Sequence, residues 1–408
     1  MKALVTILIV ITGYAGLSQS LLKGKIMDSK TKIPVTGASI FLSNTSIGTN
    51  SNDKGEFSLN IPAGSYELIV TSLNYDTYIL QLEPGNFQSD ITVILNEAPK
   101  ILPDVIVESY DKNGWSKWGK YFTSNFIGNT TAAKKCNLKN PEAVKFKFNE
   151  NTNSLRAFTN DVLLFENQEL GYRIKYVLLN FKIDFNNNSF KFAGHPAFEN
   201  LVPKSEKEQQ KWMANRAEVY AGSLRQFMKS LYNDRLEAEG FEIRPVVSIS
   251  EIEKARVAEI NKRIASMEEV GGNPKLRMNK DSLSYYQDVF NLAPGDNTIA
   301  LNKKIKRADI VKSTKTDAVL LNFEGVLRVT CTLKKTPVEF YVTVQRNSHS
   351  KYTSTDINLP QKTAVIVYKN GTYFSGENFL VDGFWSWSEK LATMLPNDYG
   401  SEDNRLPD

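Results

Sequence analysis

Residues 24–95 consist of short runs in which apolar and polar residues alternate, separated by turn-forming residues. A period of two places the apolar side chains of a strand on one face, so each run predicts a half-buried β-strand. The clearest runs are Ile40 and Leu42; Phe57, Leu59 and Ile61; Tyr66, Leu68 and Val70; and Ile91, Val93 and Leu95. Several short strands at this spacing predict an all-β sandwich of seven strands over residues 21–97.

Three short segments separate these runs: residues 52–55 (NDKG), 62–64 (PAG) and 84–86 (PGN). Glycine adopts positive φ without steric cost, and Asn or Asp bonds its own backbone, so each segment predicts a tight turn. Asp53 alone falls far short of the 6–8 oxygen ligands that calcium takes. We therefore predict a hairpin turn at Asp53 and no metal site.

Residues 1–20 have the layout of a cleaved secretion signal. Lys2 precedes the nine-residue stretch 3–11 (ALVTILIVI), and small and polar residues follow. This stretch is shorter than the roughly 20 residues that span a bilayer, which disfavours an uncleaved anchor. We predict cleavage near residues 18–20, no transmembrane segment in the mature chain, and an extracytoplasmic location: periplasmic, outer-membrane-associated or secreted.

The small domain also carries an ordered set of motifs. They are GKIMD at 24–28, Pro34, GASI at 37–40, GT at 48–49, DKGEF at 53–57, PAGSY at 62–66 and SLNY at 72–75. In this order they resemble the carboxypeptidase regulatory-like domain, a transthyretin-like sandwich common in envelope proteins of the Bacteroidota. The family's usual Gly-Tyr near the end is Asn74-Tyr75 here. The resemblance implies an extracytoplasmic module that accompanies a larger domain.

The family name does not make this chain a peptidase. A zinc carboxypeptidase holds its metal with a His and a Glu three residues apart and a second, distant His. The two histidines here are His195, followed at +3 by Phe198, and His349, followed at +3 by Tyr352. Neither has the required Glu, so we exclude this activity and predict no metal and no cofactor.

Residues 98–110 are predicted as a linker and a lead-in strand, and residues 400–408 as a disordered polar tail. Residues 102–107 (LPDVIV) resemble the segment that follows the same sandwich in TonB-dependent outer-membrane receptors. A receptor barrel needs many amphipathic strands of about 9–11 residues, and residues 111–399 contain helical stretches instead. The chain is therefore not the transporter, although a role as its accessory stays open.

Residues 111–399 are predicted as one α+β domain of unknown function. Strands are expected over 144–148, 172–185, 318–333, 338–345 and 364–368. Helices are expected over 205–239, where Ser205 and Glu208 form a capping box, over 250–270, and over 384–394. Residues 273–299 show the least regular pattern and are predicted as a mobile insertion. The fold class is thus multi-domain, an all-β sandwich followed by a larger α+β region.

This larger region resembles a group of uncharacterised secreted envelope proteins that carry the same sandwich at their front. The shared segments are WGKYF at 118–122, FIG at 126–128, Cys136, NPE at 140–142, LGY at 170–172, GHPAF at 194–198, Trp212, Arg216, YAGS at 220–223, GF at 240–241, GFWSW at 383–387 and LPNDY at 395–399. The resemblance implies an architecture and a location, and no established activity.

The charge balance excludes nucleic acid as a partner. The net charge is +5, and loss of Lys2 with the signal leaves +4. These charges are dispersed along the chain, whereas a nucleic-acid interface gathers many cations on one face. An envelope protein or a glycan is the partner that we expect instead.

Four residues are candidates for binding: Trp118, Trp385, Trp387 and His195. Exposed tryptophans could stack on sugar rings or on a partner, and the alternative is that they anchor the core. Trp385 and Trp387 are two apart, so they share a face only in an extended segment and diverge in a helix. His195 lies in Gly-His-Pro, which favours a turn over a catalytic base.

Cys136 and Cys331 are the only cysteines. In an oxidising compartment they could form a disulfide that ties the front of the large region to its back. The alternative is two buried thiols that act as small apolar residues.

No catalytic arrangement is apparent. Ser223 follows Gly222 within a predicted helix, whereas a nucleophile elbow needs Gly-x-Ser-x-Gly at a strand-to-helix turn. Carboxylates are plentiful but not distinctively paired. We therefore predict no enzyme but a non-catalytic envelope protein, an interaction or binding module that the sandwich positions or docks. The alternatives are a glycan- or peptide-active hydrolase with an unrecognised site in 111–399, and an accessory of a TonB-dependent transporter.

Overall fold

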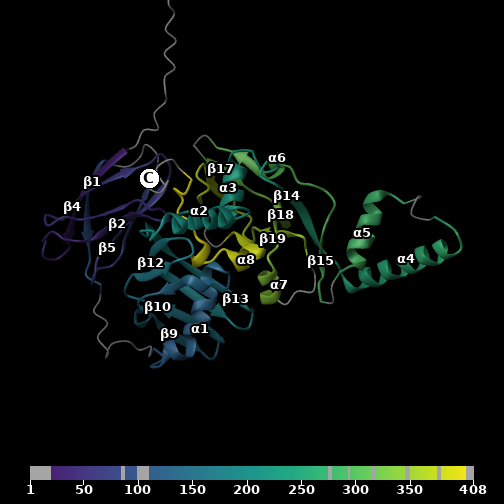
Figure 1. Cartoon of the computed structure of the whole chain (residues 1–408), viewed down its shortest axis with the longest axis horizontal. Coiled ribbons are helices and arrows are strands. Elements are labelled where there is room, and N and C mark those ends of the chain that lie inside the picture. The colour runs from purple at the N-terminus through teal and green to yellow at the C-terminus, as the bar shows by residue number, and fades with distance from the viewer. Residues whose placement is uncertain are drawn as a thin grey trace, which may run out of the picture. The chain divides into compact units, whose positions relative to one another are not determined.

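The computed structural model describes residues 20–83, 88–98, 110–273, 278–292, 295–314, 318–344, 350–374 and 378–400. The chain divides into two compact units (Figure 1). The first contains residues 1–42 and 47–100, and the second contains residues 43–46 and 101–408. The predicted signal, most of the linker and nearly all of the tail lie outside the described residues.

The first unit is built of seven strands in two sheets. The strands are β1 (Ser20–Asp28), β2 (Ser39–Leu42), β3 (Gly48–Asn50), β4 (Glu56–Ile61), β5 (Tyr66–Thr71), β6 (Tyr78–Leu82) and β7 (Asp90–Leu95). One sheet has the order β4-β1-β7, in which β1 and β7 run parallel, and the other has the order β3-β2-β5-β6. The predicted seven-strand arrangement is confirmed.

One core joins the two sheets of the first unit. Along β4, exposed and buried residues alternate strictly, which places Phe57, Leu59 and Ile61 in this core. The turn before β4 is held by Asn52, whose Oδ1 accepts hydrogen bonds from the backbone N–H groups of Lys54 and Glu56, both at 2.9 Å. Alternation and turn chemistry therefore act together, as expected for a half-buried strand.

The first part of the second unit is a six-stranded antiparallel sheet covered by a helix. Its elements are α1 (Gly114–Phe126), η1 (Ala132–Lys135), β8 (Cys136–Leu138), η2 (Pro141–Ala143), β9 (Lys145–Asn149), β10 (Ser154–Phe158), β11 (Leu163–Asn167), β12 (Tyr172–Asp184) and β13 (Ser189–Asn200). The sheet order is β8-β11-β12-β10-β9, and β13 pairs with β12. Phe122 and Phe126 of α1 are completely buried in an aromatic core against this sheet.

The second part of this unit contains two more sheets. The five-stranded sheet has the order β15-β14-β18-β19-β22, and the four-stranded sheet has the order β16-β17-β20-β21. These strands are β14 (Phe241–Ser248), β15 (Thr298–Ala300), β16 (Val311–Ser313), β17 (Ala318–Leu321), β18 (Val326–Lys335), β19 (Tyr352–Asn358), β20 (Val365–Tyr368), β21 (Tyr373–Phe374) and β22 (Leu380–Gly383). One core joins both sheets to the helices α3 (Leu224–Tyr232) and α8 (Phe384–Ser388).

The long helix predicted over 205–239 is two helices. α2 (Glu206–Tyr220) begins at the expected cap, where Ser205 accepts from the backbone of Glu208. It ends at Tyr220, because Ala221 turns to an extended ψ of 122° and Gly222 follows with a φ of +70°, which a right-handed helix does not allow. Ser223 then caps α3 by accepting from the backbone of Gln226. Ser223 therefore lies at a helix start and not inside a helix.

Three other predictions for this region are corrected. The segment predicted as a strand over 338–345 is the helix α7 (Val338–Val344). The helix predicted over 384–394 is the short α8 followed by the 3₁₀ turn η4 (Leu391–Thr393). The segment predicted as a strand over 318–333 is two strands, β17 and the start of β18. The remaining short helix is α6 (Arg307–Ile310).

The irregular segment predicted over 273–299 contains a helix, α5 (Lys280–Phe290). It packs against α4 (Glu251–Glu269) through a small separate core, in which Val257 and Val289 are buried (Figure 1). Tyr285 of α5 also donates a hydrogen bond of 2.8 Å to Glu253 of α4. Within the described chain, no helix has the length and apolar character that a membrane crossing needs.

Candidate functional site

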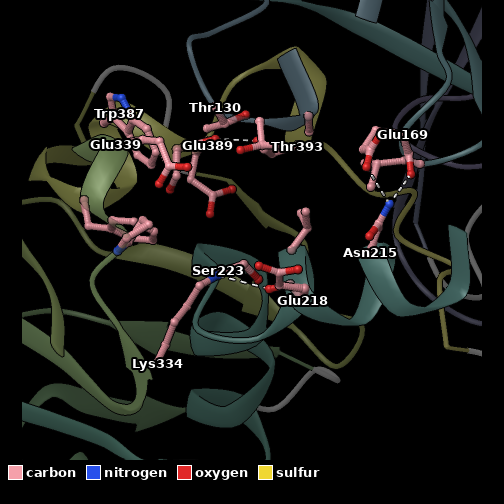
Figure 2. Close-up of a pocket in the computed structure, with 17 residues that line it drawn as sticks. Thr130, Glu169, Asn215, Glu218, Ser223, Lys334, Glu339, Trp387, Glu389 and Thr393 are labelled. Atoms are coloured by element: carbon pink, nitrogen blue, oxygen red, sulfur yellow. Dashed lines mark hydrogen bonds between the residues drawn. The ribbon is translucent and has the colours of Figure 1, made fainter. Parts of the chain in front are cut away.

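A cavity of about 290 Å³ lies in the second unit, where the chain segments of its two parts meet (Figure 2). We call it the Glu389 cavity. Its walls come from segments far apart in sequence: the loop before η1, the β11–β12 turn, the end of α2, the cap of α3, the end of β18, the start of α7, α8 and η4. The volume is near the lower end of the roughly 300–1,000 Å³ that small-molecule sites occupy.

The break between α2 and α3 shapes one wall of this cavity. The Gly222 carbonyl accepts a hydrogen bond of 2.8 Å from Trp385 Nε1, which fixes the start of α8 against the break. A Cβ at Gly222 would lie 2.8 Å from Lys334 Cδ, so only glycine allows β18 to approach this closely. The Gly222-Ser223 pair therefore brings α2, α3, α8 and β18 together around the cavity.

Lys334 contributes the one ammonium group among the described lining residues. Its Nζ donates to the carbonyl oxygens of Glu218, at 3.1 Å, and Ala221, at 2.6 Å. A cation at the carboxyl end of a helix is stabilised by the unpaired carbonyls there. Burial lowers the pKa of Lys334, and the charge of Glu389 opposes this effect.

Glu389 follows α8 and faces the cavity from the wall opposite α2 (Figure 2). Its Oε1 accepts one hydrogen bond of 3.1 Å, from the backbone N–H of Leu224. Burial raises the pKa of Glu389, although the Leu224 N–H group and the charge of Lys334 act in the opposite direction. No ion pair among the described residues involves this carboxylate, and a carboxylate offers about four acceptor positions.

Glu169, at the opposite side, has a different environment. Its carboxylate forms ion pairs with Lys135 at 2.7 Å and Lys211 at 3.0 Å. Asn215 of α2 donates to its backbone carbonyl at 2.8 Å and to its carboxylate at 3.1 Å (Figure 2). Burial raises the pKa of Glu169, but the two lysines outweigh it, and the pKa lies below its usual value.

Several polar atoms of the lining residues have unused hydrogen-bonding capacity. Thr130 Oγ1, Trp387 Nε1 and Ser388 Oγ are buried and have no hydrogen-bond partner in the described part of the chain. The overall exposed fraction is only 8% for Thr130 and 9% for Ser388. A buried polar group without a partner is costly, so these atoms mark a place where water or a ligand is favoured.

The structure separates the three candidate tryptophans. Trp387 lines the Glu389 cavity. Trp385 is 3% exposed and packs on Phe227, with ring centroids 5.3 Å apart, so it anchors the core. Trp118 is also buried, stacks on Phe148 at 4.9 Å and donates to Asp111. Because α8 begins at Phe384, Trp385 and Trp387 point in different directions, as expected for a helix.

The structure places His195 inside β13, not in a turn. His195 is 6% exposed, and its Nδ1 lies 3.1 Å from the Oγ of Ser43. Ser43 belongs to the second unit, as His195 does. It is not among the residues that line the Glu389 cavity. A strand position of this kind favours a structural role over that of a base.

The two cysteines are free and buried, so the disulfide considered from the sequence is not formed. Cys136 lies in β8, in the core beneath α1, and Cys331 lies in β18, in the core of the other two sheets. Burial raises the pKa of the Cys136 thiol to about 12, which makes it a poor nucleophile.

Sequence reasoning identified Trp387 but not the residues around it. Four glutamates and Lys334 carry the charge of the cavity, and they are spread over 220 positions of the chain, from Glu169 to Glu389 (389 − 169). Their spacing has no motif, because the cavity forms only when separate segments come together. Among the described residues, no group of three or more His, Cys, Asp or Glu side chains could hold a metal ion.

The class of the first unit is defined by comparison with known families. Residues 22–107 match the family described as CarboxypepD_reg-like domain, so the seven-strand unit is a domain of this family. The match confirms the resemblance inferred from the motifs of residues 24–75. It covers none of the elements that surround the Glu389 cavity.

Three solved structures are distantly similar to the chain. A protein of unknown function from Bacteroides fragilis NCTC 9343, described as a candidate membrane-associated protein, is 9% identical over 90% of this chain and 93% of its own, with a TM-score of 0.16. A DUF3823 family protein from Bacteroides ovatus ATCC 8483 is 10% identical over 45% and 82%, with a TM-score of 0.16. The third, a cohesin–X-dockerin complex from Acetivibrio cellulolyticus, is 18% identical over 19% and 56%, with a TM-score of 0.15.

With TM-scores this low, these similarities carry no functional argument. The chain spans just over half of the cohesin–X-dockerin chain that it matches. A search of curated proteins finds no match. The assignment of function therefore depends on the cavity itself.

Proposed function

We propose that this chain is an exported, non-catalytic envelope protein whose second unit binds a glycan fragment in the Glu389 cavity. The single observation that carries the proposal is the cavity of about 290 Å³, which is lined by Trp387 and by polar groups with unused hydrogen-bonding capacity. Sugars present an apolar face and a rim of hydroxyls, and this lining offers an aromatic ring together with donors and acceptors.

The chemistry of the lining supports binding over catalysis. The hydroxyl of Ser223 accepts the Gln226 N–H group at 3.1 Å as a helix cap, so it serves the fold and is not poised as a nucleophile. The ammonium of Lys334 is engaged by two backbone carbonyls. A nucleophile also needs an adjacent base, and no described hydrogen bond links Ser223 to one.

Export is supported by the layout of residues 1–20 and by the family of the first unit, whose role would be to position or dock the second. The test is the mature N-terminus, determined by mass spectrometry of protein from envelope extracts. A start near residues 18–20 is expected, and an intact Met1 would contradict export with cleavage.

Binding is tested by calorimetry with three soluble disaccharides: chitobiose, its N,N′-diacetylated form and cellobiose. At least one is expected to bind, and Trp387→Ala should weaken it at least about tenfold, which corresponds to 1.4 kcal/mol. Tyr121→Ala is the matched control, because Tyr121 is an exposed aromatic residue outside the cavity. Binding that Trp387→Ala leaves unchanged would contradict the proposed site.

A second function is favoured by one specific observation. A carboxyl group whose pKa is raised by burial is typical of the general acid of a glycosidase, and Glu389 has this property. Glu218 or Glu339 would then be the second carboxylate. Cleavage of a disaccharide, followed by mass spectrometry and lost in Glu389→Gln, would replace the binding role by a hydrolase.

A further inference from the structure

The charges around the Glu389 cavity are unbalanced. Four glutamates line it, Glu169, Glu218, Glu339 and Glu389, against one lysine, Lys334. Glu169 is neutralised by Lys135 and Lys211. The other three carboxylates have no ion pair within the described chain, and Figure 2 shows them around the same opening, with Glu339 and Glu389 across from Glu218.

Glu389 is the member of this set that most requires a partner. Glu218 and Glu339 are exposed at the rim, where water solvates an unpaired carboxylate. Glu389 is half-buried, and its one described hydrogen bond comes from the Leu224 N–H group. An unpaired buried carboxylate is costly unless it takes up a proton or meets a cation.

Lys334 does not supply that cation at contact distance. Its Nζ is held by the carbonyls of Glu218 and Ala221 and lies 5.5 Å from the ring centroid of Phe384. It therefore affects Glu389 only through its field, without a direct ion pair. A cationic group of a ligand would be the first direct partner of this carboxylate.

We propose that the ligand of the Glu389 cavity is an amino sugar, whose protonated primary amine lies against Glu389 while Glu218 and Glu339 attract it at the rim. This inference rests on the proposed glycan-binding function and specifies its ligand class. Thr130, Trp387 and Ser388 line the same cavity, and a small rotation of their side chains would turn their buried, unpartnered polar atoms toward the hydroxyls of the sugar.

The amine is tested with chitobiose, which carries free amines, against its N,N′-diacetylated form, in which they are neutral amides. Calorimetry near neutral pH is expected to give at least tenfold tighter binding of chitobiose. Glu389→Gln keeps an oxygen that accepts the Leu224 N–H group but removes the charge. It should abolish most of this preference and leave the affinity for the diacetylated form within about threefold.

Glu206→Gln is the matched control, because Glu206 begins the helix that carries Glu218 but lies outside the cavity. This variant should keep the full preference. Thermal unfolding without ligand verifies that each variant folds. Glu389→Gln should be as stable as the parent or more stable, since it removes a carboxyl group whose ionisation burial opposes.

The pH dependence gives an independent readout. The titratable groups near Glu389 are Lys334 of β18, Glu218 of α2 and Glu339 of α7, which line the cavity, and Tyr373 of β21. A cation binds the ionised carboxylate, so affinity for chitobiose should increase as the pH rises through the elevated pKa of Glu389, until the sugar amine loses its proton. The diacetylated form and the Glu389→Gln variant should lack this increase.

The outcomes separate the two proposals. If both forms of chitobiose bind equally and Trp387→Ala weakens both, the amine inference is overturned and the glycan site stands. A preference for the diacetylated form also overturns the inference. If no disaccharide binds, both the inference and the proposed function fail.

Discussion

The two compact units build their interiors in different ways. In the first unit, two sheets close on one core of mainly aliphatic side chains, which the strands supply by strict alternation, as in β4. In the second unit, an aromatic core forms beneath α1, a separate core joins the other two sheets, and a third, small core joins α4 and α5. A unit with several cores has boundaries between them, and the Glu389 cavity lies at such a boundary.

This difference indicates which unit has polar side chains available to bind a ligand. A sandwich closed by its own strands uses its polar residues in turns, as Asn52 does. At a boundary between cores, charged side chains such as Glu389 are carried inward by the segments that meet there. The unfolding of the two units can be followed separately, because all five tryptophans of the chain lie in the second unit. Tryptophan fluorescence therefore reports the unfolding of that unit alone.

The largest effect is expected from Trp385→Ala. It removes a 3% exposed indole and its hydrogen bond to Gly222, and such truncations cost about 3–5 kcal/mol of unfolding free energy. Trp387→Ala should cost less than Trp385→Ala, because Trp387 is half-buried and its Nε1 has no described partner, whereas its ring packs on Phe340 and Phe384 at 5.5 and 5.7 Å. Urea titrations followed by the remaining tryptophans measure both, and the reverse order would make Trp387 the stronger core anchor.

Glycine substitutions in each unit test whether the two units unfold separately. Gly171 has a φ of +68°, and a Cβ there would lie 2.2 Å from the ring of the buried Trp212. Gly171→Ala should therefore destabilise the second unit by about 2–4 kcal/mol, read by tryptophan fluorescence.

The matching change in the first unit is Gly24→Ala, where a Cβ would lie 2.6 Å from the Ile91 carbonyl oxygen. It should alter unfolding followed by far-ultraviolet circular dichroism and leave the tryptophan transition in place. A shift of the tryptophan transition in Gly24→Ala would mean that the two units unfold together.

A smaller effect than that of Trp385→Ala is expected at Lys390, which is 6% exposed and has its Nζ 3.3 Å from the ring centroid of Phe190. Burial lowers the pKa of Lys390 from 10.5 to about 7. Between these values the unfolded chain holds the proton and the folded chain does not, so stability should rise with pH in this window and be flat below about pH 7.

Lys390→Met should remove this slope and raise stability at pH 7 by on the order of 1–3 kcal/mol, since it replaces a buried amine with an apolar chain of similar length. Thermal unfolding from about pH 6 to 10 measures the slope. A slope that persists in the variant would assign it to another group. Because Lys390 lies in the second unit, the same measurement shows how much a buried amine lowers the stability of that unit.

The interior of the first unit could be predicted from sequence because alternation is a local signal. Phe57, Leu59 and Ile61 were assigned to one face from their spacing, and all three lie in the core. Local sequence patterns gave the wrong secondary structure where contacts with distant parts of the chain determine it. Residues 338–345 are predicted as a strand, yet β18 is already paired by β14 on one edge and β19 on the other, which leaves no edge of β18 for the segment between β18 and β19.

The candidate site was predictable in part. The segment around Trp385 and Trp387 was singled out, and the divergence of the two rings follows from the helix that begins at Phe384. Glu389 could not be identified, because its chemistry depends on Leu224 and Lys334, which are remote in sequence. The break at Gly222 could not be predicted either, since helical spacing continues on both sides of it while Ala221, Gly222 and Ser223 leave helical backbone angles.

The two free thiols have a practical consequence for making this protein. Cys136 and Cys331 are buried in different cores and are the only cysteines, so the native chain needs no oxidant to reach its fold. A recombinant chain that begins at Ser20 should accumulate folded in the reducing cytoplasm of an expression host. Purification then needs no refolding step, and thiol-reactive labels can be directed to an introduced surface cysteine while both native thiols stay protected by burial.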